Sequence, residues 1–199
     1  ALLGVVVPTS PPAAGVVPAA ERSEPVAAHV LEAYRQRPLA FERNRGQTDP
    51  RVDFVAGGPG YTGFLAAGEA VLALRSEGKR TVLRMALVGA NPAPRVRGSG
   101  RVAGRINYLN GGDPRQGIRV PSYERVTYDD VYPGIGLVYR GDPGQLEYDF
   151  VVGPGADPGA IRLTYDGAVD LEVTGRGDLL LRTADGLIRK PPPVIYQEI

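Results

Sequence analysis

The sequence contains no cysteine and no tryptophan, and it has a single histidine, His29. Without cysteine the chain cannot form disulfides, thiolate nucleophiles or cysteine-ligated zinc sites. One histidine excludes histidine-cluster metal sites, and no serine stands in the Gly-x-Ser-x-Gly context of a hydrolase nucleophile. The sequence therefore gives no support to thiol, zinc or serine-triad enzymes.

The chain also lacks an excess of charge of either sign, and lysine is scarce. It has 23 basic and 22 acidic side chains, and its only lysines are Lys79 and Lys190. Such a balance provides no overall field to attract a nucleic-acid backbone, so we expect no nucleic-acid partner. No phosphate-binding or dinucleotide-binding glycine motif is present in a suitable context, and we expect no cofactor and no metal. A calcium site built from Asp113, Asp129 and Asp130 stays an alternative, because oxygen ligands can converge from distant loops.

Long hydrophobic runs are absent too. No stretch reaches the ~18 apolar residues that a membrane-spanning helix requires. Glycine (27) and proline (19) are abundant instead, and they are spread along the chain. This punctuation favours many short strands joined by turns over long helices.

The first 25 residues have no periodic pattern and contain five prolines. An apolar start followed by small residues and prolines is typical of a signal-peptide remnant or a disordered leader. We therefore expect an exported protein whose folded domain spans residues 26–199. Val26, Val30, Leu31 and Tyr34 fall at helical spacing, so the pattern predicts one short helix over residues 26–36.

From Phe41 onward the apolar residues follow a period of two. In the segment over 81–88, Leu83, Met85 and Leu87 form the expected core face, and residues 145–152 alternate in the same way. Residues 91–104 contain no such alternation and are interpreted as a long exposed connection. The pattern predicts strands over 52–56, 61–66, 70–75, 81–88, 106–109, 123–128, 136–139, 145–152, 161–165, 169–173, 179–182, 187–189 and 194–199.

Many short strands at even spacing indicate an all-β protein. The expected architecture is an antiparallel β-sandwich, or paired packed sheets, with one short N-terminal helix. A parallel sheet would need helical crossovers, which this sequence does not provide. The last predicted strand stops in mid-pattern, so we expect a chain that is truncated at its C-terminus.

Two carboxylates offer the one route to hydrolytic chemistry. Glu147 and Asp149 lie two residues apart on a predicted strand, so both point to one face about 6–7 Å apart. Paired acids at such a spacing could act on a glycoside. The alternative is the polar face of an amphipathic strand, with the acids paired to arginines of a neighbouring strand.

Tyrosine is the most frequent aromatic residue, with ten copies against four phenylalanines. Tyr123, Tyr128, Tyr132 and Tyr139 are dense in one region, and with Asn107 they could form a surface that stacks on sugar rings or on a peptide. The alternative is that these rings lie at the rim of the core with their hydroxyls toward water.

Three segments stand in order along the chain: FERNRGQTDP from residue 41, YERVTYDDVYPGIGLVYRGDPGQLEYDF from residue 123, and PPVIYQEI from residue 192. Together they resemble a bacterial domain of unknown function. That domain precedes SBBP-type β-propeller repeats in large exported proteins. The resemblance implies an extracellular β-rich module, with Glu42, Asn44, Gly46 and Gln47 among its marker positions, and it brings no catalytic residues.

Together these observations predict a non-catalytic binding or scaffolding module of a secreted or cell-surface bacterial protein. Its expected partner is an adjacent set of C-terminal β-propeller repeats or a cell-surface polymer. The alternatives are a glycan-binding module that uses the tyrosines and a glycoside hydrolase that uses Glu147 and Asp149.

Overall fold

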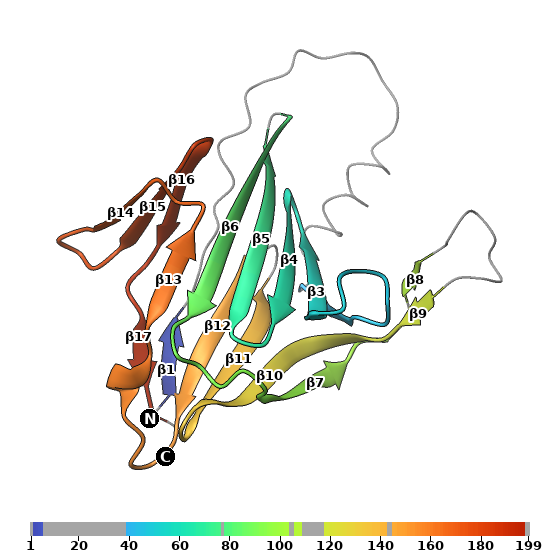
Figure 1. Cartoon of the computed structure of the whole chain (residues 1–199), viewed down its shortest axis with the longest axis horizontal. Helices are drawn as coiled ribbons and strands as arrows, with labels where there is room; N and C mark the ends of the chain where they lie inside the picture. Colours follow the sequence, from blue (N-terminus) through green and yellow to red (C-terminus); the bar gives the residue numbers. More distant parts are fainter. Residues whose placement is uncertain are drawn as a thin grey trace, which may run out of the picture.

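The computed structural model describes residues 2–5, 39–76, 78–103, 106–108, 118–142 and 145–197. Throughout these ranges the chain is built from strands, and its helical content is a three-residue 3-10 turn at Pro158–Ala160 (Figure 1). The all-β class is therefore confirmed. The helix predicted over 26–36 lies outside the described residues. Among the described residues, the structure has no helix that is long and apolar enough to cross a membrane.

Most strands join one twelve-stranded sheet, and each pairing within it is antiparallel. Short turns connect sequence neighbours, as glycine-rich hairpins allow. β7 (Arg95–Arg101) pairs with β10 beside the main path. In spatial order the path runs β13 (Leu163–Asp166), β6 (Lys79–Leu87), β5 (Glu69–Ser76), β4 (Tyr61–Ala66), β3 (Val52–Gly58), β2 (Phe41–Arg43), β10 (Ser122–Tyr132), β11 (Ile135–Asp142), β12 (Gln145–Val152), β1 (Leu2–Val5) and β17 (Val194–Tyr196).

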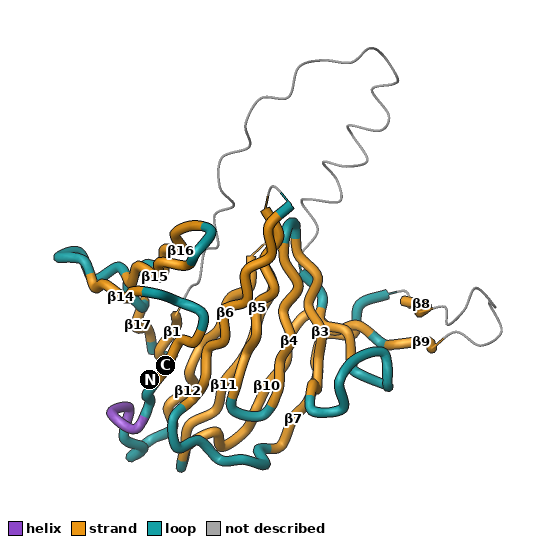
Figure 2. Tube along the Cα trace, turned by 45° about the horizontal axis from the view of Figure 1, so that its top comes forward, coloured by secondary structure: helices purple, strands orange, loops and turns teal. Residues whose placement is uncertain are grey.

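This sheet curls, so that its two halves face each other across one core (Figure 2). Buried side chains from β3–β6 and from β10–β12 belong to the same hydrophobic cluster. The hydroxyls of Tyr148 on β12 and Tyr165 on β13 lie 3.5 Å apart, although these strands stand near opposite ends of the sheet. The structure thus differs from two separate packed sheets: a single twisted sheet supplies both facing layers.

The period of two in the sequence explains which side chains reach this core. Leu83, Met85 and Leu87 are buried, as predicted for their face of β6, whereas Val82, which precedes them on the opposite face, is 55% exposed. On β12, the apolar residues Leu146, Tyr148 and Phe150 alternate in the same way and are all buried in the core cluster. Each large apolar side chain removed from water contributes about 1.5–3 kcal/mol, so this alternation fixes the register of both strands.

One prediction about the connections is wrong. Residues 91–104 are not a continuous exposed loop, because Arg95–Arg101 forms β7 and pairs with Tyr123–Asp129 of β10. A register shift in β10 follows this pairing, between Tyr128 and Tyr132, and Asp130 there has a left-handed φ of 55°. The bulge turns Tyr132 toward the core, where its hydroxyl donates toward the Val88 and Arg162 carbonyls.

Two small sheets complete the described fold. β8 (Ile106–Tyr108) and β9 (Ile118–Val120) pair as a two-stranded antiparallel sheet that projects from the main sheet (Figure 1). β14 (Asp170–Val173), β15 (Leu179–Thr183) and β16 (Gly186–Lys190) form a three-stranded sheet beside β6. We call this second unit the cover sheet.

Asp185, in the turn between β15 and β16, fastens the cover sheet to the β5–β6 hairpin. Its carboxylate accepts a hydrogen bond from Thr81 Oγ1 at 2.5 Å and lies 3.5 Å from Lys79 Nζ. The chain enters the cover sheet through Gly167, whose φ of 92° is in the left-handed region, and leaves it through Pro191–Pro193. The cover sheet is thus held at its turn and at both of its connections.

Candidate functional site

The predicted carboxylate pair lies on the outer face of β12. Asp149 is buried there and forms an ion pair with Arg140 of β11, and Arg140 also donates to the Tyr196 hydroxyl at 3.1 Å. Glu147 is half-buried. Burial and the neighbouring Asp142 raise the pKa of Glu147, and Arg140 opposes this rise. The two acids thus share a face, as predicted, and this face also carries the arginine.

These carboxylates point away from the cavity described below. Leu146 and Tyr148, the residues that alternate with them on β12, line that cavity from the opposite face of the strand. The structure thus places Asp149 in an ion pair, on the face of β12 opposite to this cavity.

Replacing Asp149 by asparagine should destabilise the fold. Loss of the carboxylate leaves the Arg140 guanidinium half-buried without its counter-charge. Because the arginine side chain is 37% exposed, water recovers part of this loss, and we expect the free energy of unfolding to fall by about 2 kcal/mol. Urea denaturation of the Asp149→Asn and Glu147→Gln proteins measures the effect, and the second variant should change stability by less than half as much.

The expected open tyrosine surface is wrong for three of its four residues. Tyr128, Tyr132 and Tyr139 are all buried in the hydrophobic cluster, and the rings of Tyr128 and Tyr139 meet edge to face at 5.9 Å. Tyr123 is half-buried and packs edge to face on Phe54. Buried rings cannot stack on a sugar. A ring that is fully buried in the core stabilises the fold more than a ring at the rim, because more of its apolar surface is removed from water.

The remaining predicted positions are dispersed. Asn107 is exposed on β8, outside the main sheet. Asp129 is paired with Arg97 at 2.7 Å and with Arg95 at 3.5 Å, so its charge is already compensated. Asp113 lies outside the described residues, which contain no cluster of metal-ligating side chains.

The loop after β2 is held by its own polar side chains. Asn44 Nδ2 donates to the Asp49 and Val52 carbonyls at 2.7 and 2.8 Å, and its Oδ1 accepts from the Gly46 amide at 3.0 Å. Gln47 Nε2 donates back to the Arg43 carbonyl at 2.9 Å. Glu42 accepts a hydrogen bond from the Tyr108 hydroxyl. These four positions therefore shape a loop and leave few polar atoms for a ligand.

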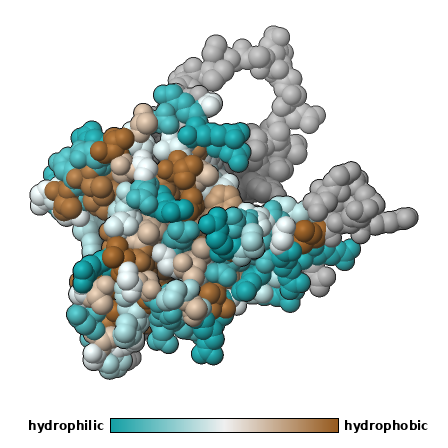
Figure 3. Space-filling model, viewed as in Figure 1, coloured by the Kyte–Doolittle hydropathy of each residue, from teal (hydrophilic) through white to brown (hydrophobic). Residues whose placement is uncertain are grey.

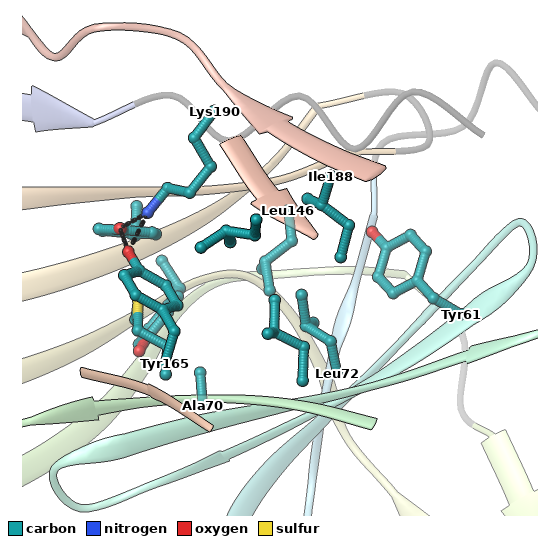
Figure 4. Close-up of a pocket in the computed structure, with 12 residues that line it drawn as sticks. Tyr61, Ala70, Leu72, Leu146, Tyr165, Ile188 and Lys190 are labelled. Carbon is teal, nitrogen blue, oxygen red and sulfur yellow. Dashed lines mark hydrogen bonds between the residues drawn. The ribbon is translucent and has the colours of Figure 1, made fainter. Parts of the chain in front are cut away.

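A cavity of ≈ 30 Å³ lies between the curled sheet and the cover sheet. Apolar side chains form most of its wall, among them Leu72 of β5 and Ile188 of β16 (Figure 4). Lys190 and Tyr165 stand at one end of the cavity and Tyr61 at the other. The remaining lining residues are Ala70, Leu83, Met85, Tyr139, Leu146, Tyr148 and Leu181.

Lys190 is the unusual member of this lining. It is the last residue of β16, and its side chain is only 4% exposed. The ammonium donates hydrogen bonds to the hydroxyls of Tyr148 and Tyr165, and it lies 4.8 Å from the centroid of each ring. Burial without a counter-charge lowers its pKa to about 7.

The phenols around Lys190 are held in their neutral form. Burial raises the pKa of Tyr165, of Tyr148 and of Tyr139, and the nearby phenols raise the last two further. Among the described residues, no carboxylate forms an ion pair with Lys190. The buried Tyr139 and Tyr61 hydroxyls have no hydrogen-bond partner within the described structure.

Our sequence reasoning missed Lys190 and this cavity. The lysine is the last residue of a short strand and stands before three prolines, and its partners Tyr148 and Tyr165 are 42 and 25 residues away. A weak signal was available in the scarcity of lysine in an arginine-rich chain. Alternation on β11 also placed Tyr139 on the same face as Ile135 and Leu137, which are both buried.

The fold and the cavity define a β-rich domain with one curled antiparallel sheet and a small covered hollow. Residues 41–199 match the family model of a domain of unknown function, DUF7948, and the chain belongs to that family. Neither the curated proteins nor the solved structures include a match to the chain.

Proposed function

We propose that this domain is a non-catalytic binding or scaffolding module of a bacterial protein that acts outside the cell or on its surface. The observation that carries the proposal is a set of large apolar side chains left open to solvent on the C-terminal strands. Val169, Val173 and Ile195 are 74%, 71% and 67% exposed, and Leu171, Leu187 and Val194 are exposed as well. Figure 3 shows apolar surface over the cover sheet.

The outermost strand of the cover sheet, β14, has one charged face and one apolar face. Asp170 and Glu172 point to its outer face, where Arg182 lies 3.6 and 3.8 Å from their carboxylates. Leu171 and Val173 point to the other face, in register with Leu181 and Leu179 of β15. An alternating strand normally buries its apolar side, so exposed leucine and valine here favour a docking surface.

We assign this surface to the polypeptide that follows the domain in the full-length protein. β17 carries exposed Val194 and Ile195 and lies at the C-terminal end of the described chain. A following domain would therefore emerge next to these residues. The resemblance to modules that precede SBBP-type β-propeller repeats makes such repeats the proposed occupant, and a cell-surface polymer is the alternative partner.

Hydrogen–deuterium exchange on the full-length protein and on this 199-residue chain tests the assignment. We expect the β14 amides to exchange at least about tenfold more slowly in the full-length protein, because docking adds protection to a marginal edge strand. The Leu171→Thr/Val173→Thr variant should lose this protection, and the Glu172→Thr variant on the opposite face should keep it.

Equal exchange of β14 in both chains would reject docking by the following polypeptide. Protection that appears only after addition of cell-wall material would assign the surface to the polymer instead.

A further inference from the structure

The cover sheet rests on the curled sheet as a separate unit. Among the described residues, no strand pairing joins β14, β15 or β16 to the curled sheet, and the core cluster of that sheet includes no residue of these strands. Each residue of β14 is exposed, and within the described strands β15 and β16 only Leu181 and Lys190 are buried. A cavity also interrupts the packing between the two sheets. A unit with so little buried surface can open while the rest of the protein stays folded.

Lys190 is the ionisable group that the cover sheet buries at this interface. Its ammonium donates hydrogen bonds to Tyr148 of β12 and Tyr165 of β13, two phenols that burial keeps neutral. Tyr139 of β11 and Tyr61 of β4 are the other titratable residues around the cavity, and its remaining residues, from β5, β6, β12, β15 and β16, are apolar. A proton on this buried nitrogen is therefore unfavourable, and exposure of the side chain to water removes the penalty.

We propose that the cover sheet is a flap that a fall in pH loosens, because protonation of Lys190 favours an opened arrangement in which this side chain reaches water. The flap is attached through two short connections, Gly167 before β14 and Pro191–Pro193 after β16. At the other end of β16, Asp185 holds the flap closed through the hydroxyl of Thr81, and this contact breaks on opening. The proposal does not depend on the docking function assigned to β14.

The two arrangements differ in the pKa of Lys190, and this difference fixes the sign of the effect. In the closed arrangement burial lowers the pKa to about 7, and in the opened arrangement the pKa returns to the ordinary 10.5. Between these two values the opened arrangement holds one more proton, so a fall in pH favours opening. We expect the equilibrium constant for opening to rise roughly fiftyfold from pH 9 to pH 7, and only about twofold more from pH 7 to pH 6.

Hydrogen–deuterium exchange of the 199-residue chain tests the proposal, with each amide's rate divided by its intrinsic rate at the same pH. The amides of β15 (Leu179–Thr183) report on the flap, and those of β11 (Ile135–Asp142) report on the curled sheet. We expect β15 to be at least about tenfold less protected than β11, and to lose protection roughly fiftyfold from pH 9 to pH 7. Low concentrations of urea should change β15 exchange little, because opening of the flap exposes less surface than unfolding.

Two variants separate the charge of Lys190 from the other contacts of the flap. In Lys190→Met the side chain keeps its apolar length and loses its charge, so the protection of β15 should be nearly equal at pH 9 and pH 7. Thr81→Val keeps Lys190 and removes the hydrogen bond to Asp185. We expect that variant to lose β15 protection about threefold to tenfold at both pH values, with the pH effect itself unchanged.

Equal protection and equal urea dependence of β15 and β11 would show that the cover sheet opens only when the whole domain unfolds, and would overturn the proposal. A pH effect on β15 that persists in Lys190→Met would belong to another group and would overturn it as well. Should Lys190→Met fail to fold, the wild-type profile decides, and a change in β15 protection below about threefold from pH 9 to pH 7 rejects the flap.

Discussion

The free energy of unfolding should rise by up to about 4 kcal/mol as the pH is raised from 7 to 10, because Lys190 is buried in the folded protein. The pKa of this lysine falls from 10.5 in an exposed chain to about 7 in the folded state. Between these two values the unfolded chain holds one more proton than the folded chain. Removing protons from solution therefore favours folding across this window, and below pH 7 both states are protonated and the slope vanishes.

The buried tyrosines reverse the rise in the free energy of unfolding at high pH. Burial raises the pKa of Tyr61 to about 12, and those of Tyr139 and Tyr148 are raised as well. Above pH 10 the unfolded chain loses phenolic protons first, so stability falls again as the pH rises. Urea denaturation in steps from pH 6 to pH 10 measures the profile. The Lys190→Met protein is the control, and its stability should be nearly flat between pH 7 and pH 9.5.

Parallel profiles for the wild type and Lys190→Met would contradict the assignment of a buried, uncompensated ammonium. A wild-type profile that is flat from pH 7 to pH 9.5 would show that Lys190 keeps its proton in the folded protein over this range. Both results are distinguishable from the loss of packing in the variant, because packing changes the height of the profile and leaves its slope unchanged.

Replacing Gly167 by alanine should cost about 3 kcal/mol or more of folding free energy. Gly167 has a φ of 92°, which a side chain disfavours by about 1–2 kcal/mol. An added Cβ would also lie 2.1 Å from the Val82 carbonyl oxygen, which belongs to the backbone of β6. That oxygen cannot move without shifting β6, so the connection into the cover sheet must give way.

Gly68→Ala separates the two causes. Gly68 has a φ of 75° and no atom within 4 Å of an added Cβ, so its substitution brings backbone strain without a clash. We expect that variant to lose only about 1 kcal/mol in thermal or urea denaturation. Equal losses of folding free energy in both variants would show that the clash between residue 167 and the β6 backbone does not contribute to the effect.

Local alternation predicted the parts of the fold that depend on neighbours in sequence. The apolar faces of β6 and β12 and the existence of most strands follow from side chains two residues apart. The strand β7 has one apolar side chain, Val96, and Arg95–Arg101 becomes a strand because β10 offers it backbone partners. The single curled sheet could not be predicted either, since strand order depends on pairings between distant segments.

The candidate site shows the same limit. The burial of Tyr128 and Tyr139 could be predicted from the alternation of β10 and β11. Tyr128 lies on the same face as buried Val126, and Tyr139 lies on the same face as buried Leu137. By contrast, the environment of Lys190 is assembled from β12, β13 and β16, and no short window of sequence contains it. The charge of a residue is a poor predictor of its burial in such a case, because lysine is almost always exposed to solvent and is expected to be so here.

The two end strands of the curled sheet, as the described residues form it, offer little backbone to a second chain. The outermost strands, β13 and β17, are only four and three residues long, and the segment between them folds into the cover sheet. A long bare edge would act as a template for another chain and lead to fibrous aggregates. Short edges joined by a compact insert give an incoming strand little backbone to pair with, and so protect a sheet that never closes on itself.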